Sequence, residues 1–321
     1  MYGGITWQVQ EIFKTSGINR IGESKHIAKE NARNDLQCSG RKANWHALGK
    51  EMGIYSYATA DAYRDVWRLL GNFAKAEFKV KDMEKLTGVH VQAFLESKIA
   101  ADVTHATFLQ YAAACEKLET ALNSLAVRTE SGRTYDFSEQ IADARADAHK
   151  MLLRFEGSRA YADPDRLVAA VRDSAHQMAA AIQRESGCRI REANRVNPEQ
   201  LRGLREDVKT GQAKGWIEVK GKGGKVREVG MSLATYAKLK ASVSNTGKRF
   251  EFNPDAYRRS LKAAAQTSSQ GYEGSHGLRW SWAQERFQEL QQNGASYAEA
   301  MVRVSYEMGH ERGDITEHYL R

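Results

Sequence analysis

Proline and cysteine are both scarce in this chain of 321 residues, which contains three of each. So few prolines permit long helices, because a proline inside a helix removes a backbone hydrogen bond and clashes with the preceding turn. Cys38, Cys115 and Cys188 are widely spaced and form no Cys-x-x-Cys pair. This spacing argues against a disulfide framework and a zinc site, and it favours reduced thiols in the cytoplasm.

Long apolar runs are absent as well. No stretch of eighteen apolar residues occurs, so no membrane span is expected. Residues 1–7 lack the basic region followed by an apolar stretch that marks a signal peptide. At 41% hydrophobic residues the chain can nevertheless bury sizeable cores, and its length suits about two domains.

Positive charge is what the chain has in excess. Its 48 Lys and Arg residues outnumber its 40 Asp and Glu residues and give a formal net charge of +8. Such a balance favours a polyanionic partner. Charge alone leaves the identity of that partner open, because many basic proteins bind no nucleic acid.

Helical periodicity dominates the first half of the chain. Residues 56–125 form the clearest block, and Thr87 and Thr104 in it are suited to cap two of its helices. The pattern by itself indicates a helical bundle whose aromatic residues serve packing. The apolar residues that share one helical face are Tyr63, Val66, Trp67, Leu70 and Phe73. Shorter helical patterns occupy residues 9–13, 23–33 and 138–155.

The second half reads as a mixture of helices and strands. The connection between the two domains is expected near residues 157–164. Pro164 is predicted to open one long helix that continues to Ile182, since proline suits the first position of a helix. A β-hairpin is predicted around residues 216–231, followed by more helices. The predicted fold class is therefore mainly α with a small β-sheet (α+β).

Two arginines in the second half stand in motifs rather than alone. Arg189 follows a Ser-Gly turn and begins a helix, and Glu192 comes one helical turn later. Residues 275–279 read Ser-His-Gly-Leu-Arg, so His276 and Arg279 can face one pocket. Arginine suits the negative charge that builds on a phosphodiester under attack, because its planar fork pairs two oxygens and stays protonated. Taken singly, each of these residues is more often an ordinary surface side chain.

The last residues add a histidine and a tyrosine. Met308-Gly309-His310 follows a helical pattern, and Tyr319 lies nine residues after His310. A tyrosine phenol has a pKa of about 10, so it needs nearby cations or a base before it can act as a nucleophile. The alternatives are a histidine that caps a turn and a tyrosine that packs in a core.

A glycine-rich basic turn lies at the tip of the predicted hairpin, where residues 220–225 read Lys-Gly-Lys-Gly-Gly-Lys. A lysine on such a tip can protonate a leaving oxygen, whereas the alternative is a solvated loop that contacts phosphate without specificity. A nucleotide-binding P-loop is excluded, because the run lacks G-x-x-x-x-G-K-[ST] and joins two strands.

In this order, the motifs over residues 165–321 resemble those of the tyrosine recombinase (phage integrase) family, which cuts and rejoins DNA. One departure is Trp280, where the family usually has a second histidine. The resemblance implies a helical core-binding domain followed by a tyrosine-recombinase catalytic domain. The expected parts are an N-terminal helical segment of uncertain role (1–55), a core-binding DNA-binding domain with its connecting helix and linker (56–160) and the catalytic domain (161–321).

The resemblance also implies roles at the reacting phosphate. Tyr319 is expected to be the nucleophile, and Arg189 and Arg279 are expected to clamp the phosphate. His276 is expected to accept the proton of the nucleophile or to hydrogen-bond the phosphate. His310 is expected to donate a hydrogen bond to the phosphate.

Further residues are expected to support this chemistry. Lys222 best matches the general acid of the family, with Lys220 and Lys225 as competitors. Glu192 is expected to hold Arg189 or the neighbouring backbone. Lys220, Lys225 and Arg227 are expected to contact DNA.

The implied reaction runs through a 3′-phosphotyrosyl intermediate and a Holliday junction, with no metal or other cofactor. The implied partners are double-stranded DNA with inverted-repeat core sites, three further copies of the chain in a tetramer on two sites, and an accessory DNA-bending protein. The free chain is expected to be a monomer or a weak oligomer, encoded by a bacterium or phage and located at the nucleoid. Two alternatives stay open: a type IB topoisomerase or telomere resolvase of the same fold, and a DNA-binding protein without activity.

Overall fold

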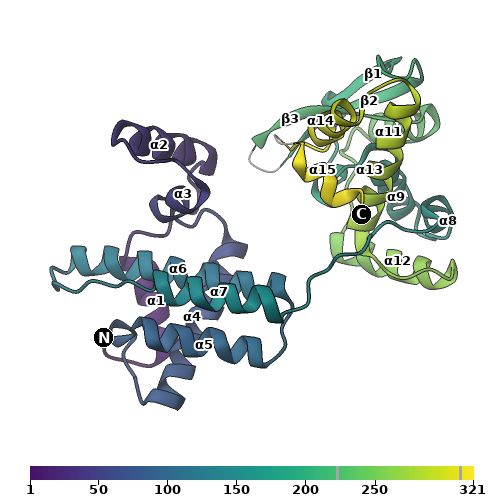
Figure 1. The fold of residues 1–321 in the computed structure, drawn as a ribbon. Helices are drawn as coiled ribbons and strands as arrows, with labels where there is room; N and C mark the ends of the chain where they lie inside the picture. The colour runs from purple at the N-terminus through teal and green to yellow at the C-terminus, as the bar shows by residue number, and fades with distance from the viewer. Residues whose placement is uncertain (222–223, 311–312) are drawn as a thin grey trace. The chain divides into compact units, whose positions relative to one another are not determined.

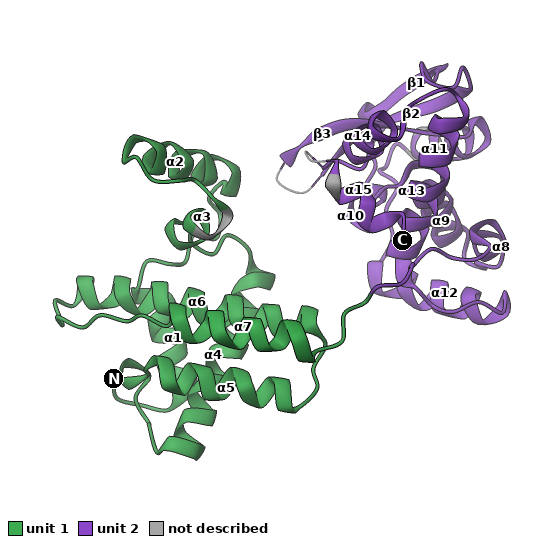
Figure 2. Cartoon of the chain, viewed as in Figure 1, with its two compact units in different colours: residues 1–155 green, residues 156–321 purple. Residues whose placement is uncertain are grey.

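The computed structural model describes residues 1–221, 224–310 and 313–321. It divides the chain into two compact units, Met1–Phe155 and Glu156–Arg321 (Figure 2). Helices make up most of both, and one three-stranded sheet lies in the second, so the predicted fold class is confirmed (Figure 1). Within the described ranges, no helix is both long and apolar enough to cross a membrane.

The first unit is a helical bundle around a core of aromatic and branched side chains. Trp67 and Phe108 are fully buried, and the indole N–H of Trp67 donates to the Ala114 carbonyl at 2.7 Å, which joins α4 to α6. Side-chain caps start most helices, as at Ser24 and Thr104. The elements are α1 (Ile5–Thr15), α2 (Lys25–Cys38), α3 (Trp45–Glu51), α4 (Tyr57–Phe78), the 3-10 helix η1 (Met83–Lys85), α5 (Gly88–Ala100), α6 (His105–Arg128) and α7 (Ser138–Met151).

The second unit packs helices around an antiparallel sheet in the order β1-β2-β3. Ile217 of β2 pairs with Val229 of β3, and the hairpin ends at the pair Lys220 and Val226. The elements are α8 (Pro164–Ala169), α9 (Ser174–Ser186), α10 (Ile190–Ala193), η2 (Pro198–Gln200), β1 (Leu201–Glu206), β2 (Ala213–Lys220), β3 (Val226–Met231), α11 (Leu233–Thr246), α12 (Pro254–Thr267), α13 (Gly274–Gln292), α14 (Tyr297–Glu307) and α15 (Asp314–Tyr319).

One prediction about this unit is wrong, and one strand was missed. The single long helix predicted from Pro164 is two helices, because the Asp173 side chain accepts the His176 amide hydrogen and starts α9 anew. Strand β1 was not predicted at all. Its side chains are mostly exposed, so the alternation of apolar and polar residues that reveals a half-buried strand is missing.

The end of α9 is a turn that the site requires. Gly187 has a φ of +65° and caps α9, after which Arg189 begins α10. A Cβ atom at Gly187 would lie 2.3 Å from Cε3 of Trp282, because α9 packs directly on α13. Only glycine therefore fits both the backbone conformation and the space.

We predict that Gly187→Ala destabilises the chain more than Gly247→Ala does. Gly247 caps α11 at a φ of +61°, and no described atom lies within 4 Å of its Cβ position, so both variants strain the backbone alike. Only the change at Gly187 overpacks the core, which adds about 1–3 kcal/mol. Urea denaturation of the two variants measures this difference in the free energy of unfolding, and equal losses would contradict it.

Candidate active site

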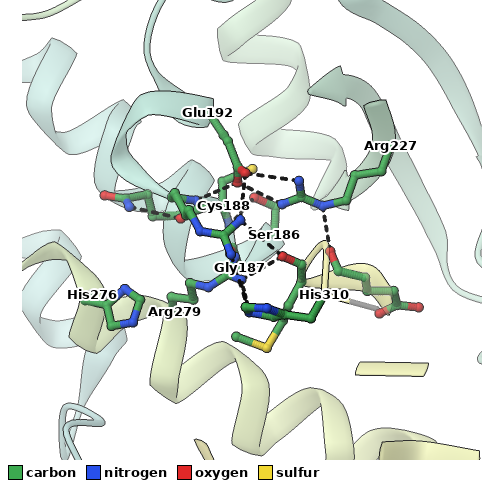
Figure 3. A network of polar contacts seen from close by, with 12 residues as sticks. Ser186, Gly187, Cys188, Glu192, Arg227, His276, Arg279 and His310 are labelled. Carbon is green, nitrogen blue, oxygen red and sulfur yellow. Dashed lines mark hydrogen bonds and ion pairs between the residues drawn. The ribbon is translucent and has the colours of Figure 1, made fainter. Parts of the chain in front are cut away.

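Four separate elements of the second unit bring five of the predicted site residues together. Helix α13 carries His276 and Arg279 one turn apart, and Arg189 stands at the start of α10. His310 follows the turn after α14, and Tyr319 is the last residue of α15. Figure 3 shows Arg279 and His310 in one network of polar contacts with the Gly187 turn, and His276 on the same helix as Arg279.

Arg279 is the buried centre of this group, with an exposed fraction of 0%. Its guanidinium donates to the Gly187 carbonyl and, at 2.7 Å, to the Met308 carbonyl. Burial and then the nearby charge of Arg189 lower the pKa of Arg279 to about 10, which leaves it protonated at neutral pH. Its buried Nε has no hydrogen-bond partner among the described residues, and an unpaired buried donor of this kind fits an anion.

Arg189 and Arg279 meet at one imidazole. Their Nη2 atoms lie 3.4 and 3.3 Å from Nε2 of His310, so this nitrogen must accept, since a guanidinium can only donate. Burial and then the charges of Arg279 and Arg189 lower the pKa of His310 to about 4. His310 is therefore neutral at physiological pH, with its ring proton on Nδ1.

Tyr319 is held against the second histidine. Its hydroxyl lies 3.3 Å from Nε2 of His276, and its ring centroid lies 5.9 Å from Cζ of Arg279. Burial, followed by the charge of Arg279, lowers the pKa of His276 to about 4. A neutral imidazole at this distance can accept the proton of the phenol. Trp280 packs on the Tyr319 ring at a centroid distance of 5.2 Å.

Glu192 balances part of the positive charge. Its carboxylate is 2% exposed and binds Arg227 through two hydrogen bonds of 3.1 and 2.8 Å. It also accepts Nη1 of Arg189 at 3.0 Å and the backbone N–H of Arg189 at 2.8 Å. Burial works against the negative charge of Glu192, but the hydrogen bonds and charges of these arginines outweigh burial and hold its pKa at about 2.

Arg227 has a different place from the one expected. It was predicted to contact DNA, yet its side chain is 3% exposed and is engaged by Glu192 and by the Glu307 carbonyl, the latter at 2.8 Å. Along β3 the residues Arg227, Val229 and Met231 all face inward. This alternation is visible in the sequence and was the signal that could have placed Arg227 inside.

The hairpin lysines are placed only in part. Lys222, the predicted general acid, lies outside the described residues. Lys220 is exposed at the end of β2, and Lys225 is half-buried with its Nζ 5.6 Å from the centroid of the Tyr306 ring. Among the residues that the structure describes, no three His, Cys, Asp or Glu side chains are grouped as metal ligands.

No protein-family model and no curated protein matches the sequence. Solved structures do match. The XerH site-specific recombinase bound to difH substrate in a pre-cleavage complex has a TM-score of 0.61 and 13% identity, covering 99% of this chain and 92% of its own. Its post-cleavage complex with palindromic difH has a TM-score of 0.60 and 13% identity, covering 98% and 91%. The Tn1549 transposon integrase in complex with transposon right-end DNA has a TM-score of 0.54 and 12% identity, covering 92% and 94%.

The chain has the fold of these site-specific recombinases. The recombinase fold extends over both units, since the match to XerH leaves almost no residue of either out. The resemblance noted in the sequence is thus confirmed at the level of the fold.

Within this recombinase fold, we predict that Glu192→Gln destabilises the chain by about 3–5 kcal/mol, because it leaves Arg227 buried without a countercharge. Glu218→Gln is the matched control, since Glu218 pairs with Arg202 at the surface and exposed pairs contribute about 0–1 kcal/mol. The folded pKa of Glu192 lies below its ordinary value of 4.5, so its contribution is complete above pH 4.5 and is lost as the pH falls toward 2. Urea denaturation at pH 7 measures both variants, and similar losses for the two would argue against the ion pair.

Proposed function

We propose that the chain is a site-specific DNA recombinase that cleaves and rejoins DNA through a 3′-phosphotyrosyl intermediate on Tyr319. One observation carries the proposal: the Tyr319 hydroxyl lies 3.3 Å from a neutral imidazole and beside the buried guanidinium of Arg279. A phenol needs a base and nearby cations before it attacks an anionic ester. This arrangement supplies both.

In the proposed cleavage step, the scissile phosphate binds between Arg189 and Arg279. His276 takes the phenol proton while the oxygen of Tyr319 bonds to phosphorus, and the bond from phosphorus to the 5′ oxygen breaks. The departing oxygen takes a proton from a hairpin lysine, for which Lys222 is the first candidate. The arginines stabilise the charge that develops on the non-bridging oxygens.

Access to the phosphate requires a local change. Arg279 is fully buried without DNA, and the Tyr319 ring lies close to its guanidinium. We propose that the end of α15 shifts when a phosphate enters, so that the unpaired Nε of Arg279 meets an oxygen of the substrate. His310 then turns a ring N–H to the same phosphate.

Rejoining reverses these bonds. A 5′ hydroxyl from a second duplex attacks the phosphotyrosyl link and releases Tyr319. The phosphodiester energy is kept in the covalent link, so the proposal needs no nucleotide and no divalent metal. The proposed assembly is four copies of the chain on two inverted-repeat sites, with two rounds of exchange through a Holliday junction. The first unit would act as the core-binding domain, and the positive net charge suits contacts with duplex phosphates.

We predict that Tyr319→Phe forms no covalent protein–DNA adduct yet binds DNA normally, because it loses only the attacking oxygen. The assay is a nicked suicide substrate, built from the DNA that flanks the encoding gene, run on a denaturing gel with EDTA present. Tyr306→Phe is the matched control, since Tyr306 is exposed and precedes the turn at Gly309, and this variant should react like the parent chain. An undiminished adduct in Tyr319→Phe would refute the nucleophile.

An assay of strand exchange between two labelled duplexes distinguishes a recombinase from the alternative functions. A recombinase moves label from one duplex to the other. A topoisomerase or telomere resolvase of the same fold forms the adduct but reseals within one duplex, and a DNA-binding protein without activity forms no adduct.

The pH dependence of cleavage tests the role of His276. Its folded pKa of about 4 lies below the ordinary 6.5, so the proton-accepting form persists at neutral pH and is lost as the pH falls through about 4. We therefore predict that kcat/KM for adduct formation, which reports groups of the free enzyme, stays level from pH 7 to near 5 and declines below. An acidic limb near 6.5 in a chain that circular dichroism shows to be folded would contradict this role.

A further inference from the structure

A second ionic cluster lies next to the candidate active site, within the second unit. Arg286 stands seven residues after Arg279 on α13, so both side chains leave the same face of the helix. Arg279 serves the proposed chemistry, whereas Arg286 forms no hydrogen bond or ion pair with a proposed catalytic residue in the described part of the chain. What Arg286 does contact is the last turn of α14.

The guanidinium of Arg286 is fully engaged and 5% exposed. Its Nε and Nη2 bind the two carboxylate oxygens of Glu307 at 2.8 and 3.0 Å, which is a bidentate pair. Nη2 also lies 2.8 Å from Oδ2 of Asp207, a buried residue of the turn that connects β1 to β2. Glu289 takes the remaining Nη1 at 2.6 Å. The cluster therefore ties three elements of the unit to one point.

The same turn of α14 holds the arginines of the candidate site through its backbone. The Glu307 carbonyl accepts Nε of Arg227 at 2.8 Å. The next carbonyl, that of Met308, accepts Arg279 at 2.7 Å and Arg189 at 3.4 Å. The last carbonyls of a helix have no partner within the helix, so side chains from outside can occupy them.

His310 depends on this turn as well. Its backbone N–H donates to the Ser305 carbonyl at 2.8 Å, and Gly309 before it has a φ of +77°. A Cβ atom at Gly309 would lie 3.0 Å from Nη1 of Arg227, so the turn and this arginine are packed against each other. A shift of Glu307 along the axis of α14 would thus move two carbonyls, three guanidinium groups and one imidazole together.

We propose that Arg286 and Glu307 are positioning residues for DNA cleavage: their ion pair fixes the last turn of α14, which orients Arg189, Arg227, Arg279 and His310. The expected effect on the cleavage rate rests on the proposed function. The expected effect on the geometry of the site rests only on contacts within the free chain. A buried ion pair is weak evidence for stability, because an apolar pair of similar size often serves as well. The distinct contribution of the pair of Arg286 and Glu307 is to fix the position of the last turn of α14.

The experiment uses the full chain and three variants, Arg286→Met, Glu307→Met and the double variant. The rate of adduct formation is measured at saturating protein in a single turnover, beside DNA affinity and urea stability. We expect about 10–100-fold slower adduct formation in each variant, since small misplacements of reacting groups cost about this much, with DNA affinity within about threefold of the parent. The double variant should recover stability, because Arg286 and Glu307 are removed together and the buried Asp207 keeps Lys214 at 3.0 Å, while its rate stays slow. A double variant that cleaves at the parent rate would overturn the proposal.

Glu285→Gln is the matched control on α13. Glu285 pairs with Arg184 at the surface and takes no part in either cluster, so its removal should leave the rate within about twofold of the parent. A comparable loss in this variant would show a general sensitivity of α13 and would overturn the assignment to Arg286 and Glu307.

A second readout needs no cleavage and keeps the two proposals distinguishable. The chain has nine histidines, so the ring signals can be followed by NMR, with His310 assigned from the spectrum of His310→Gln. In the parent chain the His310 ring should remain neutral at pH 5.5, because burial and then the charges of the arginines beside it hold its pKa at about 4. In the stable double variant this ring should be partly protonated at pH 5.5, as the arginines are no longer fixed beside it. If the parent forms no adduct, the proposed function fails, but the NMR readout still tests the positioning role. A His310 ring that stays neutral at pH 5.5 in the double variant overturns that role, and a partly protonated ring supports it.

Discussion

The structure of the site depends on how Arg279 is stabilised in a fully buried position. No carboxylate lies within ion-pair distance of this guanidinium among the described residues. Instead it binds two backbone carbonyls, at Gly187 and Met308, each at the C-terminal end of a helix. The negative ends of two helix dipoles thus converge on one buried cation. Glycines in the left-handed conformation, Gly187 and Gly309, end the two helices at that point, which is why the polypeptide can present both carbonyls to the same side chain.

This way of stabilising a cation leaves the site ready for an anion. Carbonyl dipoles lessen the cost of burying Arg279 but do not neutralise its charge. The single carboxylate of Glu192 is shared between Arg227 and Arg189, so it does not neutralise both. Burial, and then the net positive charge, lowers the pKa of His276 and of His310 and keeps both rings neutral. A phosphate entering between the arginines would cancel part of that charge and raise the pKa of both imidazoles. His276 would then become a better proton acceptor for Tyr319 only when substrate is bound, so that the phenol is activated in the presence of DNA and at rest without it.

The sequence predicted the elements whose signals are local. The periodicity around Trp67 and the cap at Thr104 were sufficient for helices α4 and α6, and the glycine-rich run with flanking β-branched residues was sufficient for the hairpin. The break before Ser174 was missed because Asp173 reads equally well as a polar residue inside a helix. The site residues were predicted from motif spacing, but the structure gives them partners that no motif encodes. A contact through a backbone carbonyl, such as that of Met308, does not depend on the residue type and so cannot be read from the sequence. The pair of Arg286 and Glu307 is separated by 21 positions and by a turn whose path local patterns do not specify.

The three arginines of the site differ in how firmly their side chains are held, and this difference suggests the order in which a phosphate would contact them. Arg227 is locked by Glu192, and Arg279 is held by two helix ends, so neither can change its place without moving the backbone. Arg189 alone of the three is partly exposed, at 27%, and it shares its carboxylate with Arg227. An approaching phosphate can therefore meet Arg189 first at little cost in lost contacts, and it reaches Arg279 only after the Tyr319 ring yields. This order of contact would make exposure of the proposed nucleophile depend on phosphate binding, because the displacement that uncovers Arg279 also moves the hydroxyl of Tyr319.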